Sequence, residues 1–161
     1  MWQKYVHKVQ TWKDNWNDII RYVIYPDPIL RELMCLEGDI PITQFRDKYF
    51  TKGHNTTNEI VTDEKVRILW YDNEGRDSGN MNVRNRYKEF DIYVKNDVLH
   101  NATDDRLQFR YELIAQRLKE LLIGTQYVRQ MRFQFQDEYD LWTKTSGYTL
   151  YHIAFSYKAT T

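Results

Sequence analysis

The sequence predicts an α+β protein in which an antiparallel four-stranded sheet packs on one long helix, preceded by short N-terminal helices. Two observations lead to this prediction. From residue 65 onward, the apolar pattern follows the order strand, strand, helix, strand, strand. Before residue 50, apolar residues recur every three or four positions, and prolines separate the segments. Four strands with a helix across one face form a two-layer sandwich.

The first helix is expected over residues 11–25. Pro26 ends it, because proline removes a backbone donor and restricts the residue before it. Its apolar stripe consists of Trp12, Trp16, Ile19, Ile20 and Val23.

Two more short helices are expected before residue 50. Asp27 is placed to cap the second helix, with Pro28 at its first position, and this helix should end near Gly38. Thr43 is the expected cap of a third helix over residues 44–50.

The next two elements are predicted to form a long antiparallel hairpin. Residues 66–71 and 86–95 alternate as strands, and the polar, glycine-containing segment 72–85 is expected to be a long exposed connection. The apolar faces of the two strands consist of Val66, Ile68 and Trp70, and of Phe90, Ile92 and Val94.

The central helix has the clearest pattern in the chain. Thr103 supplies a capping hydroxyl, Asp104 and Asp105 lie in the first turn, and Gly124 follows the last apolar position. Its stripe consists of Leu107, Tyr111, Ile114, Leu118 and Leu121, with Leu122 beside it.

Two strands close the chain, over residues 128–136 and 148–158, with a polar loop containing Trp142 between them. No repeat or linker divides the sequence. We therefore expect a single domain over residues 1–161, with a helical region at 1–50 and the sandwich at 65–158.

The composition restricts the possible functions. Aromatic residues make up 16% of the chain, with 13 Tyr and 5 Trp, which suits either a core or an interface. Basic and acidic residues number 23 each, so the formal net charge is zero. This balance argues against phosphate-driven nucleic-acid binding as the main function, and it permits self-association.

The single cysteine, Cys35, excludes an intrachain disulfide and a cysteine metal site. It lies in an apolar run and is expected to be buried. The N-terminus lacks the apolar core of a secretory signal, and no apolar stretch approaches the roughly 18 residues of a membrane span. These features predict a reducing, aqueous compartment.

Residues that carry chemistry are scattered. The histidines have no metal-ligand spacing and are expected at the surface or on the sheet, with His152 on the polar face of its strand. The acidic pairs lie at loops and helix starts, where capping and solubility explain them better than magnesium does. The histidines are His7, His54, His100 and His152, and the pairs are Asp63–Glu64, Asp104–Asp105 and Asp137–Glu138.

Glu89 and Asp91, followed by Lys95, resemble the acids and lysine of some nuclease cores. Those cores place one residue between the last acid and the lysine, which this spacing does not match. Together with the lack of a glycine-rich phosphate loop and of a G-x-S-x-G motif, this predicts no catalytic residue, cofactor or metal. Arg84 and Arg86 lie near the base of the first hairpin, where they either contact phosphate or an acidic neighbouring subunit, or are solvated.

Residues 86–94, RYKEFDIYV, lead into residues 105–118, DRLQFRYELIAQRL, and the helix ILRELM at 29–34 precedes the long-tipped hairpin. This order of elements, over about residues 15–158, resembles small neck and tail-completion proteins of tailed bacteriophages, tail terminators in particular. The helical N-terminus of about fifty residues departs from that pattern.

The resemblance implies a structural protein of the virion neck or tail that is present in the host cytoplasm during assembly. It implies a hexameric ring, or a dodecamer, that terminates the tail tube and joins it to the head–tail connector. The implied partners are the portal-side adaptor and the tail-tube proteins. DNA would pass through the lumen without specific binding, and no membrane or cofactor is involved.

A ring interface is head-to-tail, so two different patches must match. The segments 72–85 and 137–147 are the expected candidates for one patch, and the N-terminal helices are candidates for the other. The candidate interface residues are Trp12, Trp16, Asp72, Asn73, Glu74, Arg76, Arg84, Arg86 and Trp142.

Three alternatives remain open. A head–tail adaptor or stopper ring would differ in ring size and in its genomic neighbours. A small nuclease or nucleotide-processing enzyme would need a divalent metal and would depend on Glu89 or Asp91. A phage-encoded binding module would stay monomeric at high concentration.

Overall fold

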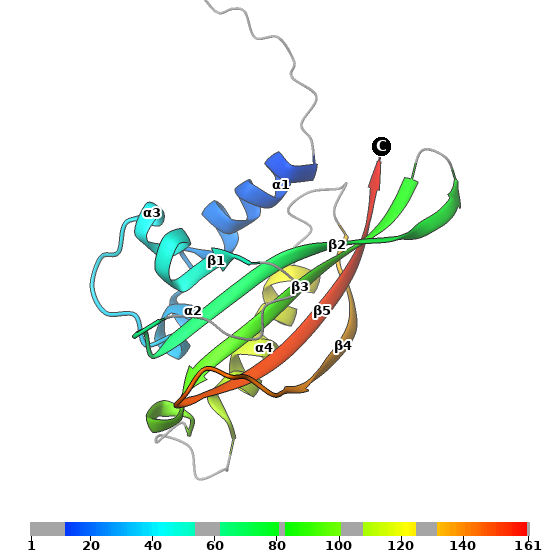
Figure 1. The fold of residues 1–161 in the computed structure, drawn as a ribbon. Helices are drawn as coiled ribbons and strands as arrows, with labels where there is room; N and C mark the ends of the chain where they lie inside the picture. The colour runs from blue at the N-terminus through cyan, green and yellow to red at the C-terminus, as the bar shows by residue number, and fades with distance from the viewer. Residues whose placement is uncertain (1–11, 54–61, 81–82, 101–107, 125–131, 161) are drawn as a thin grey trace, which may run out of the picture.

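The computed structural model describes residues 12–53, 62–80, 83–100, 108–124 and 132–160. Its centre is one twisted sheet of five strands in the spatial order β1-β2-β3-β5-β4 (Figure 1). The first pair is parallel, and the other three pairs are antiparallel. The strands are β1 Phe50–Lys52, β2 Val66–Asn80, β3 Val83–Lys95, β4 Gln134–Leu141 and β5 Tyr148–Thr160.

The predicted fold class, an antiparallel four-stranded sheet on one long helix, is wrong. The sheet has a fifth strand, β1, which pairs in parallel with Ile68–Trp70 of β2. Residues 44–50 were expected to be helical up to Phe50. Phe50 instead begins β1, because its wholly buried ring packs on Phe45 and Phe90. A strand of three residues is too short for alternation to reveal.

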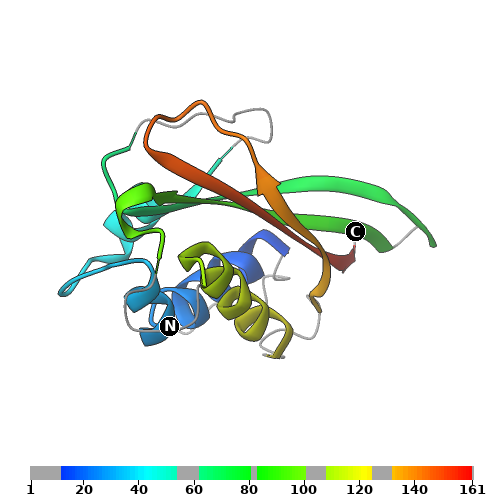
Figure 2. The same ribbon diagram turned by 90° about the horizontal axis from the view of Figure 1, so that it is seen from below.

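The helical layer is also built from several pieces. Figure 2 shows α1, α2 and α4 on one side of the sheet, so no single helix covers that face. The α-helices are α1 Trp12–Ile19, α2 Pro28–Leu33, α3 Ile42–Gln44 and α4 Arg110–Gly124. Two of them continue into π-helical turns, α1 into η1 (Ile20–Ile24) and α3 into η2 (Phe45–Tyr49). A 3-10 turn, η3, covers Asn96–Val98.

The start of α2 is as predicted. Pro28 occupies its first turn, and the carboxylate of Asp27 accepts a hydrogen bond from the backbone N–H of Leu30 at 2.8 Å. The same carboxylate accepts two hydrogen bonds from the guanidinium of Arg117 in α4, at 3.0 and 2.6 Å. Burial alone would raise the pKa of Asp27, but Arg117 and the Leu30 N–H together lower it. One side chain thus caps α2 and ties it to α4.

Other predicted helix ends lie elsewhere. The helix α2 ends at Leu33, and Cys35, which is half-buried, takes a left-handed conformation with φ of 59°. Thr43 lies inside α3, whose N-cap is Pro41. In α4 the expected stripe is buried at Tyr111, Ile114, Leu118 and Leu122 and partly buried at Leu121, and its predicted start at residues 103–107 lies outside the described residues.

The main core lies between the sheet and this helical layer. Trp16 of α1 is its centre, with ring contacts to Phe50, Phe90, Trp70 and Phe133 at centroid distances of 5.6–6.4 Å. Alternate residues of the central strands complete it from the sheet side: Val66, Ile68, Phe90, Ile92, Val94, Ile153, Phe155 and Tyr157. Leu118 of α4 is wholly buried against them.

The two segments predicted as loops, residues 72–85 and 137–147, both contain strand residues. The segment 72–85 continues the β2–β3 ladder out to Asn80 and Val83, and β5 pairs with β3 as far as Thr160. Together these three strand ends form what we call the arm, residues 74–86 with 157–160, which extends beyond the helical layer (Figure 1). The second loop is shortened in the same way, because β4 runs from Gln134 to Leu141.

No helix within the described ranges is long and apolar enough to cross a membrane.

Replacing Leu118 with aspartate is expected to unfold the domain. The substitution buries a charge and leaves a cavity against the sheet, and the combined cost is about 4 kcal/mol or more. Urea denaturation followed by circular dichroism measures the loss. The matched control is Gln116→Asp, which is exposed on the same helix and should cost less than about 1 kcal/mol. A folded Leu118→Asp variant would contradict the packing of α4 described above.

Candidate functional site

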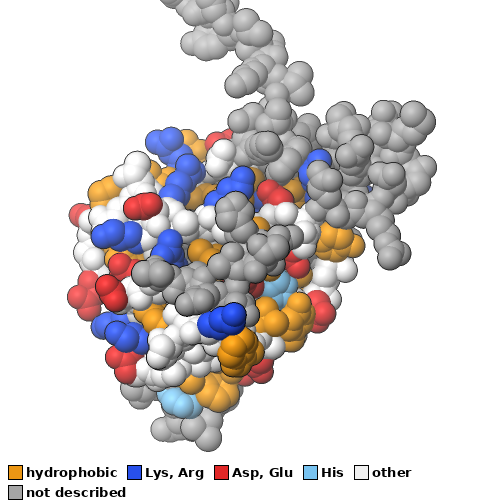
Figure 3. All heavy atoms as spheres, viewed as in Figure 1, with side chains coloured by type: hydrophobic (Ala, Val, Ile, Leu, Met, Phe, Trp, Pro, Cys, Tyr) orange, Lys and Arg blue, Asp and Glu red, His pale blue; other side chains and the backbone are white. Residues whose placement is uncertain are grey.

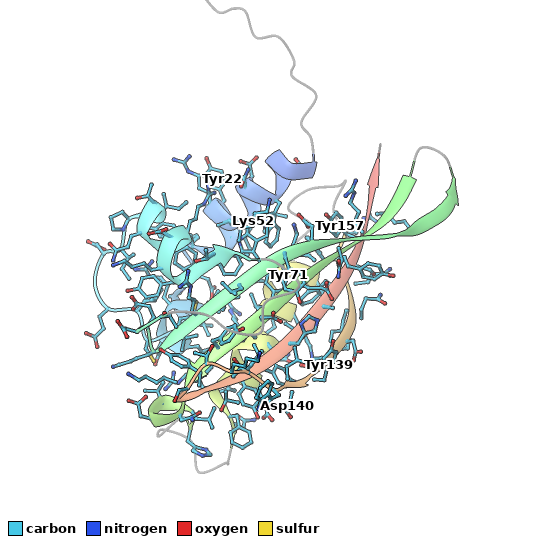
Figure 4. All side chains as sticks on the ribbon, viewed as in Figure 1. Tyr22, Lys52, Tyr71, Tyr139, Asp140 and Tyr157 are labelled. Carbon is cyan, nitrogen blue, oxygen red and sulfur yellow. The ribbon has the colours of Figure 1, made fainter. Side chains whose placement is uncertain are left out.

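The sheet face opposite the helices carries a polar cluster that spans four strands. The strand register sets Asp91 of β3 beside His152 of β5, and Tyr139 of β4 on the other side of His152. One step along, Glu89 lies between Tyr71 of β2 and Ala154. These residues all occupy the positions that alternate with the core, so they project to the same side (Figure 4 labels Tyr71 and Tyr139).

His152 is the centre of the cluster and is only 3% exposed. Its Nδ1 lies 2.7 Å from Asp91 Oδ1, and its Nε2 lies 3.3 Å from Glu89 Oε1. The hydroxyl of Tyr71 lies 3.3 Å from the same Nδ1. Glu89 in turn accepts a hydrogen bond from the side-chain amide of Asn73. Both imidazole nitrogens therefore face carboxylates.

The charge state of His152 follows from these contacts. Burial lowers the pKa of an imidazole, but here the hydrogen bonds and charges of Asp91 and Glu89 outweigh burial and raise the pKa of His152 to about 9. The ring is then protonated at neutral pH and donates from both nitrogens. The pKa of Tyr71 is raised by its burial and by the nearby carboxylates, so its phenol stays neutral.

A groove of about 270 Å³ opens beside this cluster. Ala154 forms part of its lining between Glu89 and Asp137, because its small side chain leaves space across from both carboxylates. The remaining lining consists of Asn73, Tyr87, Gln136, Tyr139 and His152.

The chemistry that this arrangement allows is narrow. An imidazolium with both nitrogens engaged has no free lone pair, so His152 is neither a general base nor a metal ligand at neutral pH. Glu89 and Asp91 are each held by that imidazolium. In the part of the chain that the structure describes, no group of three His, Cys, Asp or Glu side chains is arranged to hold a metal ion. The cluster is best suited to fixing the four strands together and to presenting hydrogen-bonding groups in the groove.

The sequence pattern missed the burial of His152, which was expected as an ordinary polar-face histidine. Glu89 and Asp91 were noticed, but only for their similarity to nuclease acids. The signal that connects all three is the register of β3 with β5. Register depends on pairing across 61 residues of sequence, which no local pattern reveals.

A second unexpected group lies on the helical side, where Lys88 is wholly buried. Its ammonium lies 4.3 Å from the centroid of a Trp16 ring and 4.9 Å from that of Trp70, and it pairs with the carboxylate of Asp72. Burial lowers the pKa of Lys88 to about 8, against the opposing effect of Asp72. Position 88 is in step with Phe90 and Ile92, so alternation places it on the core face, although a lysine is seldom fully buried.

The expected interface residues occupy different environments. Trp16 lies in the core, Asp72 pairs with Lys88, Asn73 belongs to the groove and Arg86 is half-buried at the base of the arm. Trp142 is 70% exposed directly after β4. Trp12 begins α1, and Glu74, Arg76 and Arg84 lie on the strands of the arm; their side chains are outside the described part of the structure.

Exposed apolar side chains gather at β4 (Figure 3). Four of the seven large hydrophobic residues that are exposed within the described ranges lie on β4 or directly after it, so this edge is the main apolar feature of the described surface. They are Phe135, Tyr139, Leu141 and Trp142, and we call them the β4 rim. The other three, Tyr22, Ile29 and Ile123, are on helices.

The raised pKa of His152 predicts a pH-dependent stability. The folded-state pKa of about 9 exceeds the unfolded value of about 6.5. The stabilisation of the fold by the charged imidazole is therefore complete below pH 6.5 and is lost as the pH rises toward 9. Lys88 has a lowered pKa of about 8, so the stability of the fold rises as this side chain loses its proton above pH 8. Between pH 6.5 and 8 the free energy of unfolding of the wild type should therefore fall by about 1–2 kcal/mol relative to that of His152→Gln.

Urea unfolding of both proteins at several pH values across this window measures the difference. A constant difference between the two proteins would contradict the charged pairing. If the variant does not fold, the imidazole of His152 in the wild type can be titrated by NMR, and a midpoint near 6.5 instead of 9 would contradict the pairing equally.

The comparisons with known proteins agree with a phage origin. No curated protein matches the sequence. A family model described as YomW matches residues 17–157, which include β1 to β4, most of β5, and all of α2 and α4. This family is phage-derived and of the Bacillus prophage SPBc2 type. The match covers most of the chain, and the protein therefore belongs to the YomW family.

Proposed function

We propose that this chain is a structural virion protein of a tailed phage, forming a ring at the head–tail junction that terminates the tail tube and joins it to the connector. A hexamer is favoured and a dodecamer is the other ring size considered. The partners are further copies of the chain, the portal-side adaptor and the tail-tube protein. DNA passes through the lumen without specific binding. The protein would reside in the virion neck or tail, after assembly in the host cytoplasm.

The observation that carries this proposal is the arm. Residues 74–80 alone extend β2 by roughly 20 Å at the usual rise of a strand. The helices, the His152 cluster and the described core residues lie in the body of the protein, except that Tyr157 at the base of the arm is also buried in the core. A pair of strands that extends beyond the body is typical of chains that reach a neighbouring molecule.

The chemistry of the polar cluster supports a role without catalysis. Glu89 and Asp91, the two acids that resemble those of a nuclease centre, are both paired with the imidazole of His152. The phage-derived family supports a function in the phage. An adaptor or stopper ring uses the same surfaces and differs in its ring size and its neighbours. A monomeric phage-encoded binding module is the other alternative.

The test is the solution mass of the purified protein across a concentration series, measured by light scattering after gel filtration, with electron micrographs of any large species. A ring of six or twelve supports the proposal, as does a monomer that forms a ring when connector or tail-tube protein is added. A protein that stays monomeric with every virion partner would favour the binding module.

Shortening the arm is expected to abolish assembly without unfolding the body. Glu74 and Arg86 are paired across β2 and β3, so residues 75–85 can be replaced by an Asn-Gly turn that joins these two positions. The variant should keep the circular dichroism spectrum of the wild type and lose the ring in light scattering. A shortened protein that assembles as well as the wild type would rule out the arm as an assembly element.

A further inference from the structure

We propose that the groove beside the His152 cluster binds the guanidinium of an arginine side chain that another protein presents. This inference goes beyond the proposed ring and does not depend on it, because it applies equally to a ring subunit and to a monomeric binding module. It rests on the shape of the groove, on the charges around it and on the hydrogen-bonding groups of its lining.

The groove is centred on one small side chain. Ala154 of β5 lies between Glu89 of β3 and Asp137 of β4 in the strand register, so two acids flank it in one row of the sheet. At the usual strand spacing, the Cα atoms of these two acids lie about 10 Å apart. Tyr87 and Tyr139 line the groove from the rows on either side. Two carboxylates and two phenol rings thus border a space of about 270 Å³.

The charge around this space is negative. The positive charge of His152 is shared between Glu89, at 3.3 Å, and Asp91, at 2.7 Å. Together with Asp137, three carboxylates therefore surround one imidazolium. Their effect reaches Tyr139, because burial and the charges of these three acids raise the pKa of its phenol. An anion would be repelled from the groove, and a cation would be attracted to it.

Bases of the protein do not neutralise this excess. Among the described residues that line the groove there is no lysine or arginine. Lys158 is on the same face of β5, but it lies four residues from Ala154, roughly 13 Å at the usual rise of a strand. Lys119 pairs with Glu138 on the side of the sheet that the helices cover. The groove is therefore suited to a positive charge from outside the chain.

The lining offers mainly hydrogen-bond acceptors to a ligand. The donors present are directed at other groups of the protein. The amide of Asn73 donates to Glu89, and the amide nitrogen of Gln136 donates to Ser156 Oγ at 2.7 Å. This orientation leaves the amide oxygen of Gln136, like the carboxylate of Asp137, as an acceptor. A ligand rich in N–H donors therefore matches the groove.

A guanidinium fits these conditions better than an ammonium. It is planar, its N–H donors form a rigid fork that matches carboxylates, and it stacks on aromatic rings such as those of Tyr87 and Tyr139. An ammonium is a compact, strongly hydrated point charge that would use fewer of these groups. The space of about 270 Å³ is smaller than most pockets for whole small molecules, roughly 300–1,000 Å³, and suits a single side chain.

The surroundings of the groove indicate that a protein supplies this arginine. Tyr139 belongs both to the groove and to the β4 rim, so the groove continues into the exposed aromatic surface that reaches Trp142. Protein interfaces are enriched in aromatic residues and arginine, and their strongest contacts are side chains that fill a pocket within such a surface. A free small cation would fill the groove and leave the rim uncovered.

Titration with a blocked arginine tests this inference. The probe is N-acetylarginine amide, added to the isotope-labelled protein and followed by NMR, and its neutral isostere N-acetylcitrulline amide is the control. We expect saturable shifts of the Tyr139 and His152 signals with the arginine probe. The citrulline probe should bind at least about tenfold more weakly, because it cannot form charge-assisted hydrogen bonds. Spermidine that binds more tightly than the arginine probe would overturn the assignment in favour of a free polyamine.

A pair of substitutions on β4 locates the binding. Asp137 is exposed and accepts a hydrogen bond from the backbone N–H of Glu138 at 2.9 Å, which asparagine can also accept. Asp137→Asn should therefore fold and bind the arginine probe about tenfold more weakly than the wild type. The matched control is Asp140→Asn, which should bind it unchanged, because Asp140 pairs with Tyr151 on the side of the core (labelled in Figure 4).

Three outcomes would overturn this inference: no saturable shifts with the arginine probe, equal binding of the citrulline probe, or an unchanged affinity in Asp137→Asn. None of them bears on the ring, which light scattering tests separately.

Discussion

The contact on which the rest of the structure depends is that of Lys88 with Trp16 and Asp72. A wholly buried ammonium costs several kcal/mol unless it is paired, and here a carboxylate and two indole rings surround it. Trp16 belongs to the helical layer, whereas Lys88 and Asp72 face each other across β2 and β3 just before the arm begins. The position of α1 on the sheet and the position of the arm relative to the body are thus set by the same group. Removing Asp72 would leave the buried charge of Lys88 without its ion-pair partner, so this pair stabilises the base of the arm.

The sequence predicts the parts of this fold that depend on local periodicity. Alternation identifies the inner halves of β2, β3 and β5, and the stripe of α4 identifies the residues that are buried from Tyr111 to Leu122. The cap at Asp27 is also predictable, since capping depends on four consecutive residues. In each case the free energy that decides the structure comes from neighbours in sequence or from one apolar face.

The parts that fail depend on pairing between distant residues. The strand β1 exists because β2 offers it an edge, and the outer halves of β2 and β3 remain strands although their residues are polar, because β3 pairs with strands on both sides along most of its length. Lys88 occupies the same face of β3 as Phe90, so alternation places it toward the core, where the ring of Trp16 lies beside its ammonium. His152 was predicted on the polar face, and that face is buried there because Asp91 and Glu89 meet it from β3. Trp142 is the candidate interface residue whose described side chain agrees best with a surface role, since an exposed tryptophan in a polar loop needs no distant partner.

The zero net charge conceals an uneven distribution that has a structural consequence. The β4 edge has three acids and no base, and residues 71–80 of β2, on the other side of the sheet, have three acids and one arginine, so the bases that balance the charge lie elsewhere in the chain. Such a chain is poorly protected against self-association by net repulsion, while the acids of β4 disfavour the pairing of two β4 edges with each other. A ring contact that covers the β4 rim would remove the aggregation hazard that exposed aromatic groups on an edge strand create for a monomer. The exposed residues of the β4 rim are therefore consistent with a subunit in which a neighbouring molecule covers β4.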